Sequence, residues 1–169
     1  MARQRIPVIG VMGGAQVDHK VEEQAFALGA AIAEQGWILL NGGRDSGVMR
    51  ASAQGAKSRN GLTIAILPGK SPNDANPFID IAIATGMADA RNLINVLSSD
   101  VVVACRGASG TLCEIALALK NRRPLILLDP LDPQAILPYG AAGQIYITKT
   151  VDECMATLHL LLPAQPAKD

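Results

Sequence analysis

Short runs of apolar residues alternate along the chain with longer segments that carry apolar residues at helical spacing. The runs are rich in Val, Ile and Leu and lack the polar alternation of half-buried strands. Continuous apolar runs are typical of parallel strands that are covered on both faces. The predicted strands are Pro7–Met12, Trp37–Leu40, Thr63–Leu67, Ile81–Ala84, Val101–Ala104, Leu125–Leu128 and Ile145–Thr148.

The segments between these runs predict helices. Val21–Gln35 has one apolar face and ends before Gly36, and Val48–Arg59 ends near Gly61, as glycine often terminates helices. Further helices are predicted around Leu93, Val96 and Leu97, around Leu112, Ile115, Ala116 and Leu119, and over Val151–Leu162. Alternating strands and helices joined by right-handed crossovers predict an α/β fold, a Rossmann-like three-layer α/β/α arrangement with a mostly parallel sheet of about seven strands.

The chain has the length of one domain, which we place at residues 1–162. Residues 163–169 contain two prolines and a charged end and are expected to form a disordered tail. Apolar residues make up 49% of the sequence and aromatic residues only 3%, so the core is expected to be aliphatic and rich in alanine.

The charge balance narrows the range of partners. Lys and Arg together number 15, as do Asp and Glu, so no bulk positive field favours nucleic acid or an anionic membrane as a partner. No apolar stretch approaches the length of a membrane span. The spacings of Cys105, Cys113 and Cys154 match neither a zinc site nor a disulfide framework, which favours reduced thiols and a cytoplasmic location. His19 and His159 are expected at the surface, and no metal site is predicted.

Glycine-rich turns follow three of the predicted strands. In a parallel sheet such turns open on the same edge and can converge on one crevice. Glycine lets backbone N–H groups approach an anion closely, so the turns predict a site for a phosphate-bearing small molecule. The alternative is that they are tight turns without a ligand. The candidate residues are Gly13 and Gly14, then Gly42, Gly43, Arg44, Ser46 and Gly47, then Gly107, Ala108, Ser109, Gly110 and Thr111.

The motifs of the best-known nucleotide sites are absent. The chain has no P-loop Gly-Lys-Ser/Thr, and the first turn does not fit GxGxxG, which disfavours an NAD-dependent dehydrogenase. Arg44 and Arg106 lie in the turns and are candidates to clamp the same anion through paired N–H groups.

Two charged residues outside the turns are further candidates. Arg91, followed by Asn92, is expected in the first turn of a helix, where the macrodipole disfavours a cation. A ligand phosphate, Glu114, Asp89 or solvent are the possible compensating partners. Glu114 has capping-box spacing from Thr111, so it either caps its helix or projects into the crevice as a ligand for a sugar hydroxyl or a general acid/base.

The stretch 68–78 is long and rich in turn residues. It is interpreted either as a mobile flap beside the site or as a plain surface excursion.

Together the opening strand with its Gly-Gly turn and the segments NGGRDSGVMRASAQGA, ARNLINVLSSDVVVACRGASGTLCEIALAL and KNRRPLILL resemble the molybdenum cofactor carrier protein family. This family is related to the Lonely guy phosphoribohydrolases and DNA-processing-A-like proteins. In the hydrolase branch a PGGxGTxxE motif binds phosphate and supplies a glutamate, and an arginine precedes it. Gly107, Gly110, Thr111 and Glu114 match that motif, and Arg91 matches the arginine.

Three departures from the hydrolase pattern favour the carrier branch. Arg106 stands in place of the proline, Ala108 in place of the second glycine, and Asn92 in place of a lysine after Arg91. The resemblance implies a carrier that binds the molybdenum cofactor by its phosphate, protects it and delivers it to molybdoenzymes. It also implies a homo-oligomer, a dimer or tetramer. The alternative is a nucleoside 5′-monophosphate phosphoribohydrolase in which Arg91 and Glu114 act on the nucleotide, and a nucleotide-sensing module is a third possibility.

Overall fold

All the predicted strand segments form strands in the computed structural model, which describes residues 5–162. Two of them begin one residue later than predicted, because Pro7 and Trp37 lie just before their strands. The strands are β1 (Val8–Met12), β2 (Ile38–Asn41), β3 (Thr63–Leu67), β4 (Ile81–Ala84), β5 (Val101–Ala104), β6 (Leu125–Leu128) and β7 (Ile145–Thr148). The predicted tail at 163–169 lies outside the described residues, and the domain boundary at residue 162 stays a prediction.

The strands form one seven-stranded sheet in the order β4-β3-β2-β1-β5-β6-β7. Each neighbouring pair is parallel, which confirms the Rossmann-like α/β prediction. The chain builds the sheet outward from β1 to β4 and then returns to place β5 on the other side of β1. The strand order therefore reverses between β1 and β5, which is where open α/β sheets form a crevice at the carboxyl ends of their strands.

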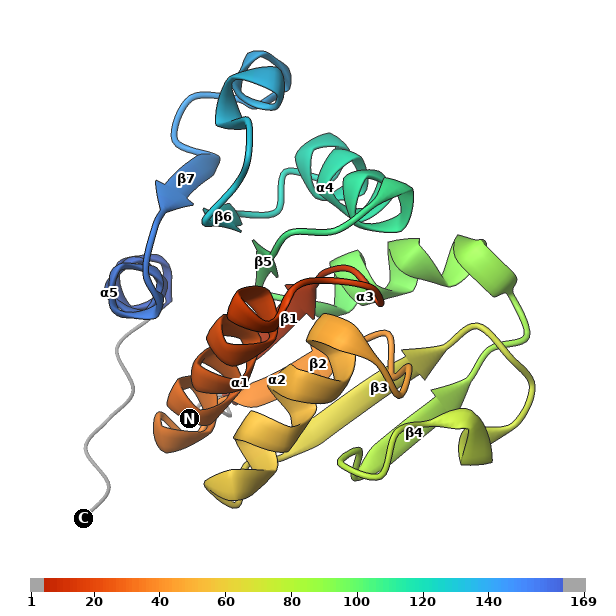
Figure 1. The fold of residues 1–169 in the computed structure, drawn as a ribbon. Coiled ribbons are helices and arrows are strands. Elements are labelled where there is room, and N and C mark those ends of the chain that lie inside the picture. The colour runs from red at the N-terminus through yellow and green to blue at the C-terminus, as the bar shows by residue number, and fades with distance from the viewer. Residues whose placement is uncertain (1–4, 163–169) are drawn as a thin grey trace.

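Helices cover both faces of the sheet and give the three predicted layers (Figure 1). They are α1 (His19–Glu34), α2 (Gly47–Ser58), α3 (Asn92–Ser98), α4 (Ser109–Lys120) and α5 (Val151–Leu161). The helices α1, α2 and α5 contribute to one aliphatic core, and α3 and α4 to the other. Along β5, Val101 and Val103 enter the first core while Val102 and Ala104 enter the second, so the strand is apolar at every position. Within residues 5–162, no helix combines the length and the apolar character that crossing a bilayer requires.

Local signals account for the ends of the long helices. Asp18 caps α1, since its carboxylate accepts a hydrogen bond of 3.0 Å from the Val21 N–H, and Gly36 follows the helix with a φ of +70°. After α2 the left-handed residue is Asn60 rather than the predicted Gly61. Gly61 is needed for space, because a Cβ there would lie 2.5 Å from that of Ala33.

Two glycines allow α1 and α2 to pack with their backbones in contact. A Cβ on Gly29 of α1 would lie 2.0 Å from the Ser52 carbonyl oxygen, and one on Gly55 of α2 would lie 1.9 Å from that of Phe26. Carbonyl oxygens of a helix cannot shift as a flexible side chain can. The pairing of α1 with α2 therefore depends on glycine at both positions.

We expect Gly55→Ala to destabilise the protein by about 1–3 kcal/mol, because the overpacking cost exceeds the gain of roughly 1 kcal/mol in helix propensity. Urea unfolding followed by circular dichroism measures the change. Gln54→Ala, an exposed substitution one position away, is expected to stay within about 0.5 kcal/mol of the parent. Equal stability of the Gly55→Ala variant and the parent would contradict this packing.

Candidate functional site

The three glycine-rich turns meet at the carboxyl edge of the sheet around a hollow of about 200 Å³. The hollow lies at the β1/β5 reversal, as predicted for a sheet of this kind. The predicted residues that line it are Gly13, Gly14, Gly42, Arg44, Arg91, Asn92, Ala108, Gly110, Thr111 and Glu114. The predicted residues Gly43, Ser46, Gly47, Gly107 and Ser109 lie in the same turns but outside the lining.

Gly14 joins the first turn to the other two. Its N–H donates to the Arg106 carbonyl at 3.0 Å, and its carbonyl accepts from the Val48 N–H at 3.0 Å. The backbone of Gly14 leaves no room for a side chain on either of two glycines that contact it. A Cβ on Gly107 would lie 2.7 Å from the Gly14 nitrogen, and one on Gly47 would lie 2.3 Å from the Gly14 oxygen. These glycines are required for the turns to touch, and the Gly14 amide is already occupied by a protein carbonyl.

The second turn is shaped by Asn41, the last residue of β2, which the sequence interpretation missed. Its buried side chain donates to the Met49 carbonyl at 2.9 Å and accepts from the Gly43 N–H at 2.8 Å. The Gly43 carbonyl in turn accepts from the backbone and side chain of Asn76, at 2.9 and 3.2 Å. The Gly43 amide is thus also used within the protein.

Asn76 belongs to the stretch 68–78, which was predicted to be either a flap or a surface excursion. The stretch contains a short 3₁₀ turn, η1 (Pro72–Asp74), and Asn76 is buried against the second glycine turn. Its side chain also donates to the Arg44 carbonyl at 3.3 Å. The carboxyl end of the stretch is therefore bound to the site, and closure of the rest stays a prediction.

The third turn leads into α4 and supplies free amides. Ala108 occupies the N-cap position without a side-chain cap, and the Leu112 N–H is the first to bond back, to the Ala108 carbonyl at 3.1 Å. The N–H groups of Ser109, Gly110 and Thr111 have no acceptor among residues 5–162, as expected for a helix's first turn. Gly110 and Thr111 belong to the lining, so two of these amides and the positive end of the helix dipole lie on this side of the hollow.

Arg91 also lines the hollow, from the end of a 3₁₀ turn, η2 (Ala88–Arg91), directly before α3. Its guanidinium covers Gly42, where a Cβ would lie 2.3 Å from Nη1. The side chain is 7% exposed, and its Nε and Nη1 have no hydrogen-bond partner among the described residues. Burial lowers the pKa of Arg91, an effect that the nearby Glu114 carboxylate opposes. A buried cation with unsatisfied donors is a costly arrangement that an anion in the hollow would relieve.

Glu114 also faces the hollow, and the capping-box interpretation of it is wrong. The helix α4 begins at Ser109, so Thr111 and Glu114 lie inside it and Glu114 caps nothing. The Glu114 side chain is 7% exposed and accepts a hydrogen bond of 2.9 Å from Asn95 Nδ2. Burial raises the pKa of Glu114, while the Asn95 hydrogen bond and the Arg91 charge oppose that rise.

The two arginines of the glycine turns behave differently. Arg44 lines the hollow, and its role in clamping an anion stays a prediction. Arg106 does not clamp the same anion, because its Nε donates to the Asp129 carbonyl and its Nη2 to the Asp129 carboxylate, both at 2.8 Å. Asp129 directly follows β6, the neighbour of β5, and has a φ of +48°. The proximity of these two strand ends directs Arg106 away from the hollow.

Lining residues that the sequence interpretation missed are Val11, Met12, Ala15, Met49 and Asp89. Asn95 was missed as well, although it lies four residues after Arg91 at a spacing that places both on one helix face. Among residues 5–162 no group of His, Cys, Asp or Glu side chains has the arrangement of a metal site.

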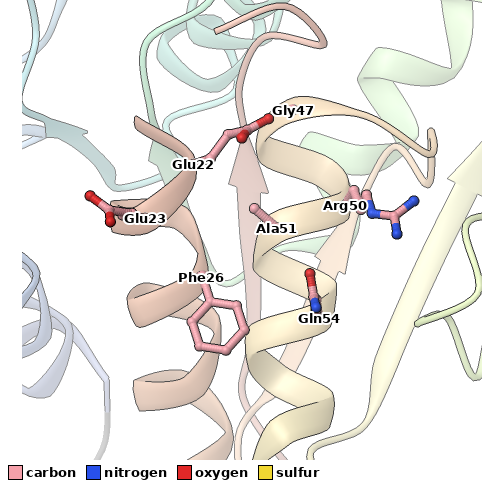
Figure 2. A pocket seen from close by; sticks show the side chains of 7 residues that line it. All are labelled: Glu22, Glu23, Phe26, Gly47, Arg50, Ala51 and Gln54. Carbon is pink, nitrogen blue, oxygen red and sulfur yellow. The ribbon is translucent and has the colours of Figure 1, made fainter. Parts of the chain in front are cut away.

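A larger hollow of about 470 Å³ lies between α1 and α2 (Figure 2). Phe26 of α1 lines one side and Ala51 and Gln54 of α2 the other, while the Arg50 guanidinium points away from α1. Arg50 donates to Asp45 at 2.6 Å and lies 5.5 Å from the Phe78 ring, so its charge is already engaged. The lining of this hollow between α1 and α2 includes no unpaired buried donor of the kind that Arg91 supplies.

We expect Glu114→Gln to stabilise the protein at neutral pH by about 1 kcal/mol, because glutamine keeps an oxygen for Asn95 and removes a buried charge. The folded-state pKa of Glu114 is raised, so its ionisation costs stability above that pKa and costs nothing below the unfolded value near 4.5. The stability difference between variant and parent should therefore shrink as pH falls from 8 to 5.

Thermal unfolding at each pH measures this difference, which should be roughly 2–4 °C in Tm at neutral pH. Glu34→Gln, at an exposed position of α1 that pairs with Arg59, is the control and should show no such pH-dependent difference. A Tm difference between Glu114→Gln and the parent that stays constant with pH would contradict the effect of burial on the Glu114 carboxyl.

The chain matches the SLOG cluster4 family over residues 6–155. The molybdenum cofactor binding protein from the phototrophic bacterium Rippkaea orientalis is 48% identical, with a TM-score of 0.88 over 93% of this chain and 98% of that one. The molybdenum cofactor carrier protein from Chlamydomonas reinhardtii is 41% identical, with a TM-score of 0.86 over the same shares of the two chains.

A more distant relative is the cytokinin riboside 5′-monophosphate phosphoribohydrolase of Mycobacterium tuberculosis. It is 31% identical over 64% of this chain and 62% of its own length. The resemblance to the molybdenum cofactor carriers is thus confirmed, and the link to the hydrolases is the weaker of the two. The sheet, its three joined turns and the match over residues 6–155 lead to one assignment: the chain belongs to the SLOG cluster4 family.

Proposed function

We propose that this protein binds the molybdenum cofactor, a phosphate-bearing pterin, stores and protects it, and delivers it to molybdoenzymes. The cofactor's phosphate occupies the space between Arg91, which covers Gly42, and the free amides of Ser109 to Thr111. We call these groups the anion cradle. The observation that carries the proposal is the Arg91 side chain, buried in the lining of the hollow with two nitrogens unpaired.

The energetics of the cradle suit a phosphate without a P-loop lysine. A hydrogen bond to a charged group contributes about 1.5–3 kcal/mol, so three amides and a guanidinium suffice for firm binding. The neighbouring carboxyl of Glu114 adapts to the anion, because its raised pKa eases proton uptake when a second negative charge arrives. The similarity to proteins described as molybdenum cofactor carriers, at 41% and 48% identity, supports the choice of ligand.

The rest of the proposal concerns location and partners. A cytoplasmic location rests on the unpaired cysteines.

The predicted dimer or tetramer is supported by an open part of the sheet, because Ile81 and Ile83 of the edge strand β4 are 45% and 46% exposed. They share a face with their β3 partners, Ile64 and Ile66, which belong to the core that α3 and α4 cover. Parallel sheets are normally covered on both faces, so a second copy is the expected cover.

We expect the molybdenum cofactor to survive longer when it is incubated with the wild-type protein than with serum albumin. Reconstitution of an apo-molybdoenzyme measures the cofactor that remains. Arg91→Met should weaken cofactor and inorganic phosphate binding by at least about tenfold, the loss of one charge-assisted hydrogen bond. Without ligand the variant should be as stable as the parent or more so, since an unpaired buried cation is removed. Arg59→Met is the matched control, because Arg59 is exposed and pairs with Glu34. Protection no better than that of albumin would refute the proposal.

The alternative function is hydrolysis of a nucleoside 5′-monophosphate. The observation that favours it is the position of Arg91 and Glu114 in one hollow, as the hydrolase resemblance implies. Release of free base from AMP, lost in Glu114→Ala, would establish it. No release at micromolar protein would remove it.

We expect sedimentation equilibrium to give a dimer or tetramer, and Ile83→Asp to shift it toward monomer, because a carboxylate cannot be buried unpaired in an apolar interface. The control is Leu160→Asp, since Leu160 is an exposed apolar residue of α5. A monomeric parent protein would contradict self-association.

A further inference from the structure

A second hollow of about 280 Å³ adjoins the anion cradle on the other side of the turn between β5 and α4. Ala108 and Thr111 line both hollows, so only this turn separates them. Its remaining walls come from the ends of β5 and β6, from α4 and from the connection between β6 and β7. We call it the side compartment.

The walls of the side compartment are mainly aliphatic. Leu112 of α4 is 54% exposed, and Leu131 of the β6–β7 connection is 82% exposed, while Ile136 is half-buried behind them. Leucines that are exposed together around a concavity beside a polar site are typical of a ligand pocket. Cys105 adds to this character, because burial raises the pKa of its thiol to about 12 and keeps it neutral.

The charged groups of the compartment disfavour a second anion. The Arg106 guanidinium donates two hydrogen bonds of 2.8 Å to Asp129, which also pairs with Lys20 at 2.9 Å, so this arginine is already engaged within the protein. Asp132 is exposed and offers a carboxylate acceptor. The compartment therefore suits a flat, uncharged ring system with N–H donors on its edge.

The sizes of the two hollows point to a shared ligand. Pockets that bury an organic molecule of cofactor size measure about 300–1,000 Å³. The hollow at the cradle, at about 200 Å³, and the side compartment, at about 280 Å³, are each below that range and reach it only together. A phosphate would take up part of the hollow at the cradle, and the side compartment offers a neighbouring space for a fused ring.

We propose that the side compartment holds the fused heterocyclic ring of the ligand whose phosphate lies in the anion cradle. The ligand then crosses the β5–α4 turn at Ala108, with its anionic end facing the α4 amides and its ring between Leu112 and Leu131. This inference rests on the proposed carrier function and adds where the ring binds. It makes the β6–β7 connection a part of the binding site that determines which ring is accepted.

The test compares two probes, inorganic phosphate and molybdenum cofactor released anaerobically from a purified molybdoenzyme. Leu112→Ala/Leu131→Ala should weaken cofactor binding by about tenfold or more, because apolar contact to the ring is lost. Phosphate binding should stay within about twofold, because the cradle is intact. Calorimetry measures the phosphate affinity, and molybdenum retained in ultrafiltration measures the cofactor affinity. Leu131→Ala alone, at an 82% exposed position, should reproduce part of the effect without a risk to folding.

The matched control is Leu160→Ala, since Leu160 is 85% exposed on α5 and should alter neither affinity. If the wild-type protein binds the cofactor and the double variant binds it with the same affinity, the inference is overturned and the carrier function remains supported. A tenfold loss of phosphate binding in the double variant would also overturn it, because the two hollows would then not be separate. Wild-type protein that binds phosphate but not cofactor would overturn the carrier function, and the inference with it.

Discussion

The site depends on one residue, Gly14, whose backbone N–H and carbonyl join the three glycine turns. Its N–H is bonded to the turn after β5, and its carbonyl is bonded to the start of α2, each at 3.0 Å. The contacts at Gly47 and Gly107 leave no space for a Cβ on either side, so the turns approach as closely as backbones can. This contact lies at the reversal of the strand order, and Gly14 itself lines the hollow there.

The buried charge of Arg91 makes the hollow between the three turns suited to an anion. Protein groups satisfy the Gly14 and Gly43 amides, the Arg106 guanidinium and the Asn76 side chain. Two Arg91 nitrogens and the first amides of α4 are left without protein acceptors among the described residues. The unsatisfied donors therefore belong to residues in or next to the lining of one small hollow, while the surrounding polar groups serve only to build it. Glu114 adds a carboxyl whose raised pKa makes its charge responsive to what binds.

The two charged residues that a hydrolase would use are thus present, yet their surroundings suit retention of a ligand. Glu114 is buried and bonded to Asn95, and Arg91 lies flat over Gly42. Arg106, which replaces a proline of the hydrolase motif, ties the third turn to the end of β6 through Asp129. That bond shapes the boundary between the cradle and the side compartment, so the departure from the hydrolase pattern lies where the ligand would cross from one to the other.

Much of the fold follows from the sequence, because each strand is a continuous run of Val, Ile and Leu that only a doubly covered parallel sheet buries completely. The glycines after β1, β2 and β5 likewise indicate the edge on which a ligand site forms, and Gly107, Gly110, Thr111 and Glu114 indicate the family. Local pattern is sufficient there because strand length, turn chemistry and motif spacing are properties of neighbouring residues.

What only the tertiary structure decides is the partner of each polar group, because those partners are distant in sequence. Arg106 meets Asp129, 23 residues away, and leaves the anion site, while Glu114 meets Asn95, 19 residues away, and is no cap. The Gly14 amide is consumed by a carbonyl of another turn, and Arg91 meets none. Sequence establishes which groups are able to bind an anion, but which of them stay free depends on how the strand ends are brought together.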